Sequence, residues 1–77
     1  MKYDGDIMPI LRAMEHIKID YDINNSEIAK KVNKSTQTVS NFFKGRQPNA
    51  TLDTLKMYCG AMSCDLIIDI VPINKVK

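Results

Sequence analysis

The stretch that decides the fold is NNSEIAKKVNKSTQTVSNFF, residues 24–43. Its first half carries a well-defined helix start, because Asn24 is a good N-cap and Glu27 follows three residues later. This spacing is the sequence pattern of a capping box, in which each of the two side chains accepts a hydrogen bond from the other residue's backbone N–H. The pattern predicts a helix over residues 25–32.

A second helix follows almost at once. Asn33 lies where the chain must turn, and asparagine accepts the left-handed backbone conformation better than most residues other than glycine. Ser35 is suited to cap the next helix and Gly45 to end it, which predicts a helix over residues 36–44. Most of this helix is expected to face solvent, since its apolar residues are few: Val39, Phe42 and Phe43.

Two further helices flank this pair. The first is expected over residues 6–18, with Asp6 as its N-cap and Pro9 in its first turn, where a missing N–H matters least. One face of it carries Ile7, Leu11, Met14 and Lys18. The other helix is expected over residues 52–61 after the cap Thr51. Its buried face would be Leu52, Leu55, Cys59 and Met62.

The last segment, residues 65–71, changes period. Alternation and β-branched residues predict a strand, and a short fifth helix is the alternative. A lone strand leaves backbone groups unpaired, and antiparallel pairing across a two-fold axis would satisfy them. We therefore expect dimerisation through Leu66, Ile68 and Ile70. The alternative is an unpaired apolar tail that folds back on its own helices.

Length and composition restrict the classes of protein. Seventy-seven residues allow one domain, residues 1–77, whose core is small enough to need a disulfide, a metal or a partner subunit. Cys59 and Cys64 lie in apolar surroundings and His16 is distant from both, so we expect no disulfide, metal or cofactor. No nucleophile accompanies His16, and an enzyme is not expected. A polar N-terminus and the lack of an apolar run of ~20 residues predict a cytoplasmic chain without a membrane span.

Charge is unevenly distributed along the chain. Residues 28–46 hold five basic residues and no acid, whereas the remainder holds six basic residues against all nine acids. This asymmetry suggests a face directed at a polyanion, and a solvated lysine face is the alternative. Two short helices joined by a tight turn, the second of them polar and exposed, are what a helix-turn-helix requires. Residues near the start of such a second helix meet base edges. They are Thr36, Gln37, Ser40 and Asn41.

Residues 24–62 resemble the Xre family, the Cro/CI-type helix-turn-helix of phage and bacterial repressors. The resemblance is carried by the pattern E-I-A-x-x-V-x(2)-S-x(3)-V-S-x-F, then a glycine, then P-x(2)-x-L-x-T-L. It implies a mainly α fold, a compact four-helix lambda-repressor-like bundle, with residues 36–44 as recognition helix. It also implies that base edges are read by Thr36, Gln37, Ser40 and Asn41. The implied phosphate contacts are Asn25, Ser35, Lys44, Arg46 and Asn49.

Three positions depart from the family pattern. Asn33 replaces the usual glycine, which is benign. Asn25 stands where glutamine is common, at a position that touches a phosphate and braces Gln37, and its reach is shorter. Phe43 replaces a polar residue, often glutamate. The sequence leaves open whether Phe43 packs on a neighbour or touches DNA.

The ending LIIDIVP resembles antitoxins of the HipB kind, whose C-terminal strand pairs with its symmetry mate. The expected partners are therefore double-stranded DNA and a second copy of the chain. The expected function is sequence-specific transcription regulation by a dimeric repressor on a palindromic operator, with half-sites about one turn (~34 Å) apart. The alternative is an antitoxin that binds DNA and also neutralises a partner toxin.

Overall fold

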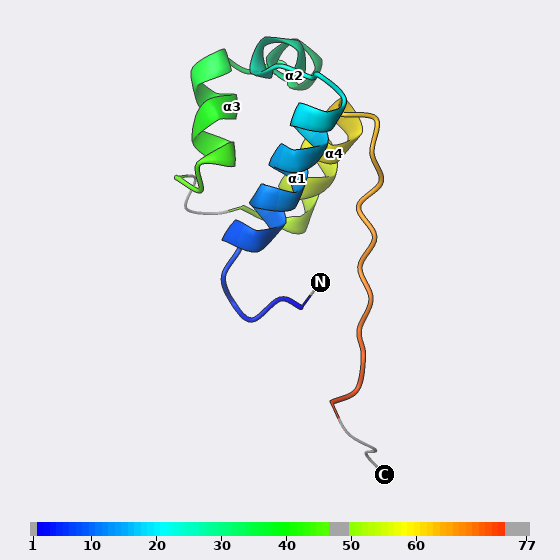
Figure 1. Ribbon diagram of the computed structural model, residues 1–77. Helices are drawn as coiled ribbons and strands as arrows, with labels where there is room; N and C mark the ends of the chain where they lie inside the picture. The colour runs from blue at the N-terminus through cyan, green and yellow to red at the C-terminus, as the bar shows by residue number, and fades with distance from the viewer. Residues whose placement is uncertain (1, 47–49, 74–77) are drawn as a thin grey trace.

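The computed structural model describes residues 2–46 and 50–73. It contains four helices: α1 (Met8–Asp20), α2 (Asn25–Val32), α3 (Thr36–Phe43) and α4 (Leu52–Ala61). Helix α2 lies across the top of the bundle in Figure 1 and packs against both α3 and α4, while α1 packs against α3. This arrangement leaves one side of α3 at the edge of the bundle.

The start and end of α2 confirm the local expectations. The Asn24 side chain accepts from the Glu27 backbone N–H at 2.9 Å, and Glu27 Oε1 accepts from the Asn24 backbone N–H at 3.2 Å. Both halves of the capping box are therefore present. At the other end Asn33 has φ 58° and ψ 48°, the left-handed conformation that lets α3 begin after two further residues.

The predicted caps of α3 and α4 are also confirmed. Ser35 Oγ accepts from the Thr38 backbone N–H at 3.1 Å, and Thr51 Oγ1 accepts from the Thr54 backbone N–H at 3.2 Å. After α3, Gly45 has φ 74°. A left-handed glycine of this kind is the usual way to end a helix, and here it brings the backbone against Met8 of α1.

The first helix differs from the expectation of residues 6–18, since it spans Met8–Asp20. Asp6 is not its N-cap. That position is held by Ile7, which makes no side-chain cap hydrogen bond. The physical reason is local: Asp6 Oδ1 accepts from the Met8 backbone N–H at 3.0 Å, which forms a turn ahead of the helix. The end of α3 also differs from the expected helix over residues 36–44. This helix ends at Phe43, one residue earlier, with Lys44 as its C-cap.

An aromatic group forms the centre of the core. Phe42 and Tyr58 stack with their ring centroids 3.8 Å apart, and Phe43 meets both rings edge-on. Burial raises the pKa of Tyr58. Within the described residues its hydroxyl has no hydrogen-bond partner. Cys59 is a free, buried thiol whose pKa is raised by burial and, secondarily, by Cys64.

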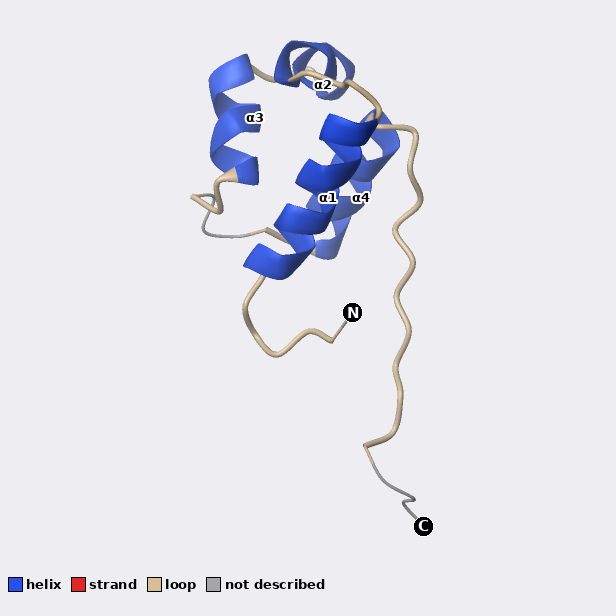
Figure 2. Ribbon diagram, viewed as in Figure 1, coloured by secondary structure: helices blue, strands red, loops and turns tan. Residues whose placement is uncertain are grey.

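The expected strand over residues 65–71 is not formed in the single chain. Among residues 2–46 and 50–73 there is no strand, and the segment after α4 runs away from the bundle without regular structure (Figure 2). The physical reason is that a strand exists only when a neighbouring strand supplies its hydrogen bonds. Leu66 packs against the core. Further along, the large apolar side chains are more than half exposed: Ile67, Ile68, Ile70, Val71 and Ile73.

Candidate nucleic-acid interface

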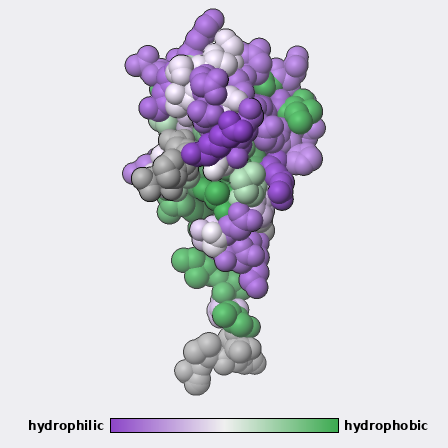
Figure 3. Space-filling model, turned by 90° about the vertical axis from the view of Figure 1, so that its left-hand side faces the viewer, coloured by the Kyte–Doolittle hydropathy of each residue, from purple (hydrophilic) through white to green (hydrophobic). Residues whose placement is uncertain are grey.

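The four expected base readers share one side of α3. Thr36 and Gln37 are exposed, and Ser40 and Asn41, one turn later, are half-buried. The opposite side of α3 is anchored in the core by Val39 and Phe42, which are 0% and 1% exposed. The bundle surface on the side of α3 is mostly hydrophilic, whereas the C-terminal segment below it is hydrophobic (Figure 3). The helix is thus held firmly by one face and presents polar groups on the other.

One hydrogen bond orders the polar face of α3. Gln37 Nε2 donates to Asn41 Oδ1 at 3.1 Å, across one helical turn. A glutamine amide has two N–H donors and a carbonyl acceptor, so this contact leaves Gln37 with one donor and its acceptor. Those two groups are what a bidentate contact to adenine requires. The hydrogen bond to Asn41 therefore orients Gln37, to which the resemblance assigns base reading, and leaves it the two groups that such a contact needs.

The expected phosphate contacts other than Asn25 fall into three groups. Lys44 and Arg46 are exposed directly after α3, where a backbone hydrogen bond from Arg46 N to Asn41 O (3.0 Å) fixes the chain. Ser35 Oγ is engaged in the helix start, because it accepts from Thr38 N and lies 2.9 Å from Thr38 Oγ1. Asn49 lies outside the described residues. The structure thus leaves the two cations after α3 as the freest of these groups.

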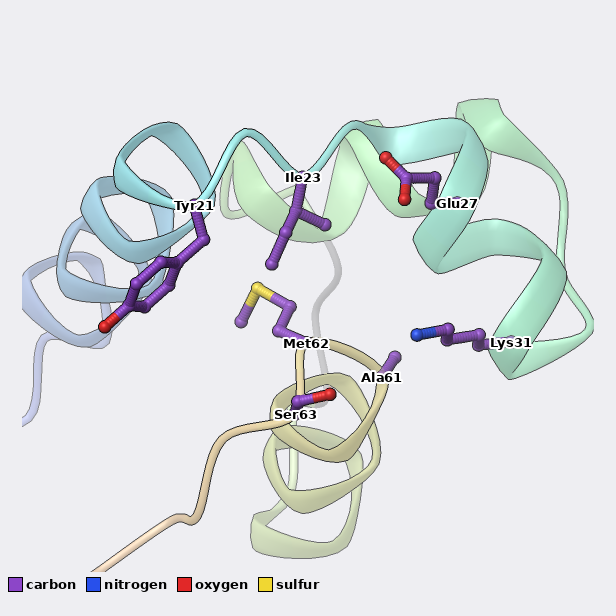
Figure 4. A pocket seen from close by; sticks show the side chains of 7 residues that line it. All are labelled: Tyr21, Ile23, Glu27, Lys31, Ala61, Met62 and Ser63. Atoms are coloured by element: carbon purple, nitrogen blue, oxygen red, sulfur yellow. The ribbon is translucent and has the colours of Figure 1, made fainter.

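The basic residues of the segment 28–46 do not form a single face. Lys31 projects from α2 toward the end of α4 and lines an open hollow with Ala61 and Met62 (Figure 4). None of the expected DNA-contacting residues lines this hollow. The basic residues of segment 28–46 are therefore spread over at least two surfaces of the domain. Of these residues, only Lys44 and Arg46 adjoin the end of α3.

Asn25 and Phe43 have defined partners in the structure. Asn25 Oδ1 accepts a hydrogen bond from Lys18 Nζ at 2.6 Å. Gln37, which the resemblance implied that Asn25 would brace, is hydrogen-bonded to Asn41 instead. Phe43 is 6% exposed, and Lys18 Nζ lies 4.1 Å from its ring centroid. Phe43 is thus a core residue that carries a cation on its face. The alternative that the sequence left open is settled in favour of packing.

Lys18 joins three helices in the structure, and the sequence indicated no role for it beyond its place on the apolar face of α1. Two signals were present in the sequence. A lysine continues the apolar face of Leu11 and Met14, and an aromatic residue replaces a polar one at position 43. The lysine and the aromatic residue explain each other, because a cation over an aromatic face needs both partners. Their separation of 25 residues hid the connection.

Within residues 2–46 and 50–73, no three His, Cys, Asp or Glu side chains gather in a way that could hold a metal ion. None of the helices in the same ranges combines the length and the apolar character that crossing a membrane would take. The features of this surface that the sequence predicted are the polar face of α3, Asn25 at the start of α2, Ser35 before α3, and Lys44 and Arg46 after it.

A short capped helix, a left-handed turn and a second helix with a free polar face together define a helix-turn-helix DNA-binding domain. The chain belongs to the Cro/C1-type HTH DNA-binding domain family, whose sequence profile matches residues 14–75. This family membership makes the chain a DNA-binding transcription regulator. Searches among curated proteins and among solved structures gave no match. The family match extends from the second half of α1 through the segment after α4.

Proposed function

We propose that the protein is a dimeric repressor that binds a palindromic operator through α3 of each copy. The observation that carries this proposal is the division of α3 into two faces. Val39 and Phe42 are buried, while Thr36 and Gln37 on the other side are exposed. A recognition helix needs both properties, a rigid mount and polar groups that can reach base edges. Bound at a promoter, the dimer would repress by occlusion.

The C-terminal segment supports the dimer. Between residues 64 and 70 the even positions are all apolar, while two of the odd positions are Asp65 and Asp69. In an extended chain alternate residues face opposite sides, so an apolar side and a partly acidic side result. Ile68 and Ile70 are 57% and 90% exposed in the single chain. Antiparallel pairing with a second copy would bury these side chains and satisfy the backbone groups.

An antitoxin is the second candidate, and the exposed apolar residues at the odd positions of the same segment favour it. Ile67, Val71 and Ile73 are 71–96% exposed and lie at odd positions. They would stay uncovered after pairing through the even positions, which suits a further protein partner. This alternative predicts that the product of a neighbouring gene is toxic alone and harmless when co-expressed with this chain. If no such neighbour exists, the antitoxin role is excluded.

Selection of binding sites from a random duplex library tests the proposed function. The expected result is enrichment of a two-fold symmetric sequence whose half-sites are centred about one helical turn (~34 Å) or a multiple of it apart. Each half-site would place one copy of α3 in the major groove. Failure to enrich any sequence, or enrichment of a single site without symmetry, would contradict the dimeric repressor.

Gln37→Ala should relax base preference at one position of each half-site. The substitution removes a bidentate contact, and we expect a loss of ~1–3 kcal/mol in binding the selected sequence. Sequences altered at that one position should bind the variant and the wild type about equally. Competition binding with duplexes changed one base pair at a time measures this. An unchanged preference at every position would remove Gln37 from the reading surface.

Lys44→Ala should weaken binding to all duplexes alike. A lysine on a phosphate acts through counterion release, so its removal should lower the slope of log K against log salt by ~1 per copy. The matched control is Lys56→Ala, which removes the same charge from an exposed position on α4. We expect the control to leave the slope unchanged. Equal slopes for the two variants would show that Lys44 is not a specific phosphate contact.

A further inference from the structure

We infer that Lys18 is a positioning residue for DNA binding, which orients the Asn25 side chain so that its NH₂ group faces a DNA phosphate. The inference rests on the proposed DNA-binding function and extends it to a residue on α1. Lys18 lies two residues before the end of that helix, and its side chain is 12% exposed. It is too enclosed to be an ordinary surface cation.

The Lys18 ammonium group has three partners in the structure. Nζ lies 2.6 Å from Glu15 Oε1 on its own helix and 2.6 Å from Asn25 Oδ1 on α2. The third partner is the face of Phe43, whose centroid is 4.1 Å away. An ammonium carries three N–H donors, and a cation over an aromatic face is attracted to it. One charge therefore joins α1, the first residue of α2 and the last residue of α3.

This contact fixes which way round the Asn25 amide lies. A lysine can only donate, so the amide must turn its oxygen toward Nζ. The NH₂ group is then directed away from Lys18, with two donors left for another acceptor. Asn25 is half-buried and is the first residue of α2, a helix end whose dipole favours an anion. A phosphate oxygen fits this set of donors, and a neutral base edge would not use the dipole.

The arrangement also explains how a short side chain can serve at this position. Asparagine has fewer rotatable bonds than glutamine, and Lys18 restrains those that remain. A donor held in place loses little side-chain entropy on binding, which offsets its shorter reach. Without the lysine, the amide would rotate freely and the donor would have to be ordered by the DNA itself. Lys18 thus acts on DNA through Asn25 and not by direct contact.

A double-mutant cycle tests this dependence, using the duplex selected by the wild-type protein. Lys18→Met and Asn25→Ala should each weaken binding about three- to tenfold, as the loss of one net hydrogen bond implies. The double variant should bind no more weakly than the weaker single variant, because both changes remove the same contact. Losses that multiply in the double variant would overturn the inference. So would a folded Lys18→Met protein with wild-type affinity.

Asn25→Asp keeps the contact with Lys18 and removes the NH₂ group that would donate to a phosphate. This test does not require any Lys18 variant to fold. The carboxylate still accepts from Lys18 and sits favourably at a helix N-terminus, so the melting temperature should be unchanged or higher. It has no donor and repels a phosphate, so affinity should fall more than about tenfold. The matched control is Ser26→Asp, the same charge change at the exposed next residue. A smaller loss is expected there, and equal losses would overturn the inference.

A DNA-free measurement separates failure of this inference from failure of the function. In wild-type protein the Asn25 side-chain amide resonances should be distinct from those of an unrestrained asparagine. In Lys18→Met they should move toward the unrestrained values. Unchanged resonances would overturn the orientation of Asn25 even if the protein binds DNA. Wild-type protein that binds no duplex, with the expected resonances, would instead overturn the proposed function.

Discussion

Phe42→Ala should lower the free energy of unfolding of the protein by ~3–5 kcal/mol. Phe42 is 1% exposed, stacks on Tyr58 and meets Phe43 edge-on. Truncating a buried phenylalanine to alanine costs ~3–5 kcal/mol, because apolar area is lost and a cavity remains. A domain of this length has a free energy of unfolding of only ~4–12 kcal/mol, from ~0.05–0.15 kcal/mol per residue. One side chain therefore accounts for a large part of the total stability.

Urea unfolding followed by far-ultraviolet circular dichroism measures this effect. Protein concentration must be held fixed, since the proposed dimerisation would contribute to stability. The matched control is Tyr58→Phe, which keeps the ring stack and removes a buried hydroxyl that has no partner among the described residues. Removing an unsatisfied buried group should leave the midpoint unchanged or raise it. A Phe42→Ala protein within about 1 kcal/mol of wild type would contradict this account of the core.

Ile68→Asp should convert the dimer to monomers and weaken operator binding at least ~100-fold. A charged side chain on the apolar side of the paired segment would be buried without a partner. Monomers would then bind half-sites one at a time and lose the gain from linking two sites, which is commonly 10²- to 10⁴-fold. Because α3 itself is untouched, the residual binding should keep the half-site base preference.

Analytical ultracentrifugation at micromolar concentration, together with DNA titration, checks both parts of this prediction. The control is Ile67→Asp, which adds the same charge one residue earlier. Ile67 is 86% exposed and lies on the other side of an extended chain, next to Asp65 and Asp69 in that register. It should remain dimeric. If Ile68→Asp also remains dimeric and binds with wild-type affinity, the segment is not the dimer contact.

The parts of the fold that the sequence predicts well are those decided within one helical turn. The capping box of Asn24 and Glu27, the left-handed Asn33 and the caps Ser35 and Thr51 all depend on neighbours four residues away or fewer. Such interactions can be recognised from spacing alone. The start of α1 was misplaced because two local interactions compete there. Asp6 can cap a helix or close a turn, and spacing does not distinguish them.

Interactions between distant residues could not be predicted from spacing. A strand depends on a partner strand, so the alternation over residues 65–71 indicates a tendency that a single chain does not express. The contacts of Lys18 with Asn25 and Phe43 likewise require the packed arrangement of three helices. The polar face of α3 was predictable because it follows from which residues are apolar. The hydrogen bond from Lys18 to Asn25 was not predictable, because it depends on how the helices pack together.

Titration of ¹⁵N-labelled protein with the selected duplex tests the central claim, that α3 reads DNA, most directly. We predict the largest amide shifts over residues 35–41 and at the start of α2, accompanied by shifts of the Gln37 and Asn41 side-chain amides. The exposed side of α4 should change little. Large shifts confined to α4 or to residues 64–71, with residues 35–41 unaffected, would contradict the assignment of α3 as the recognition helix.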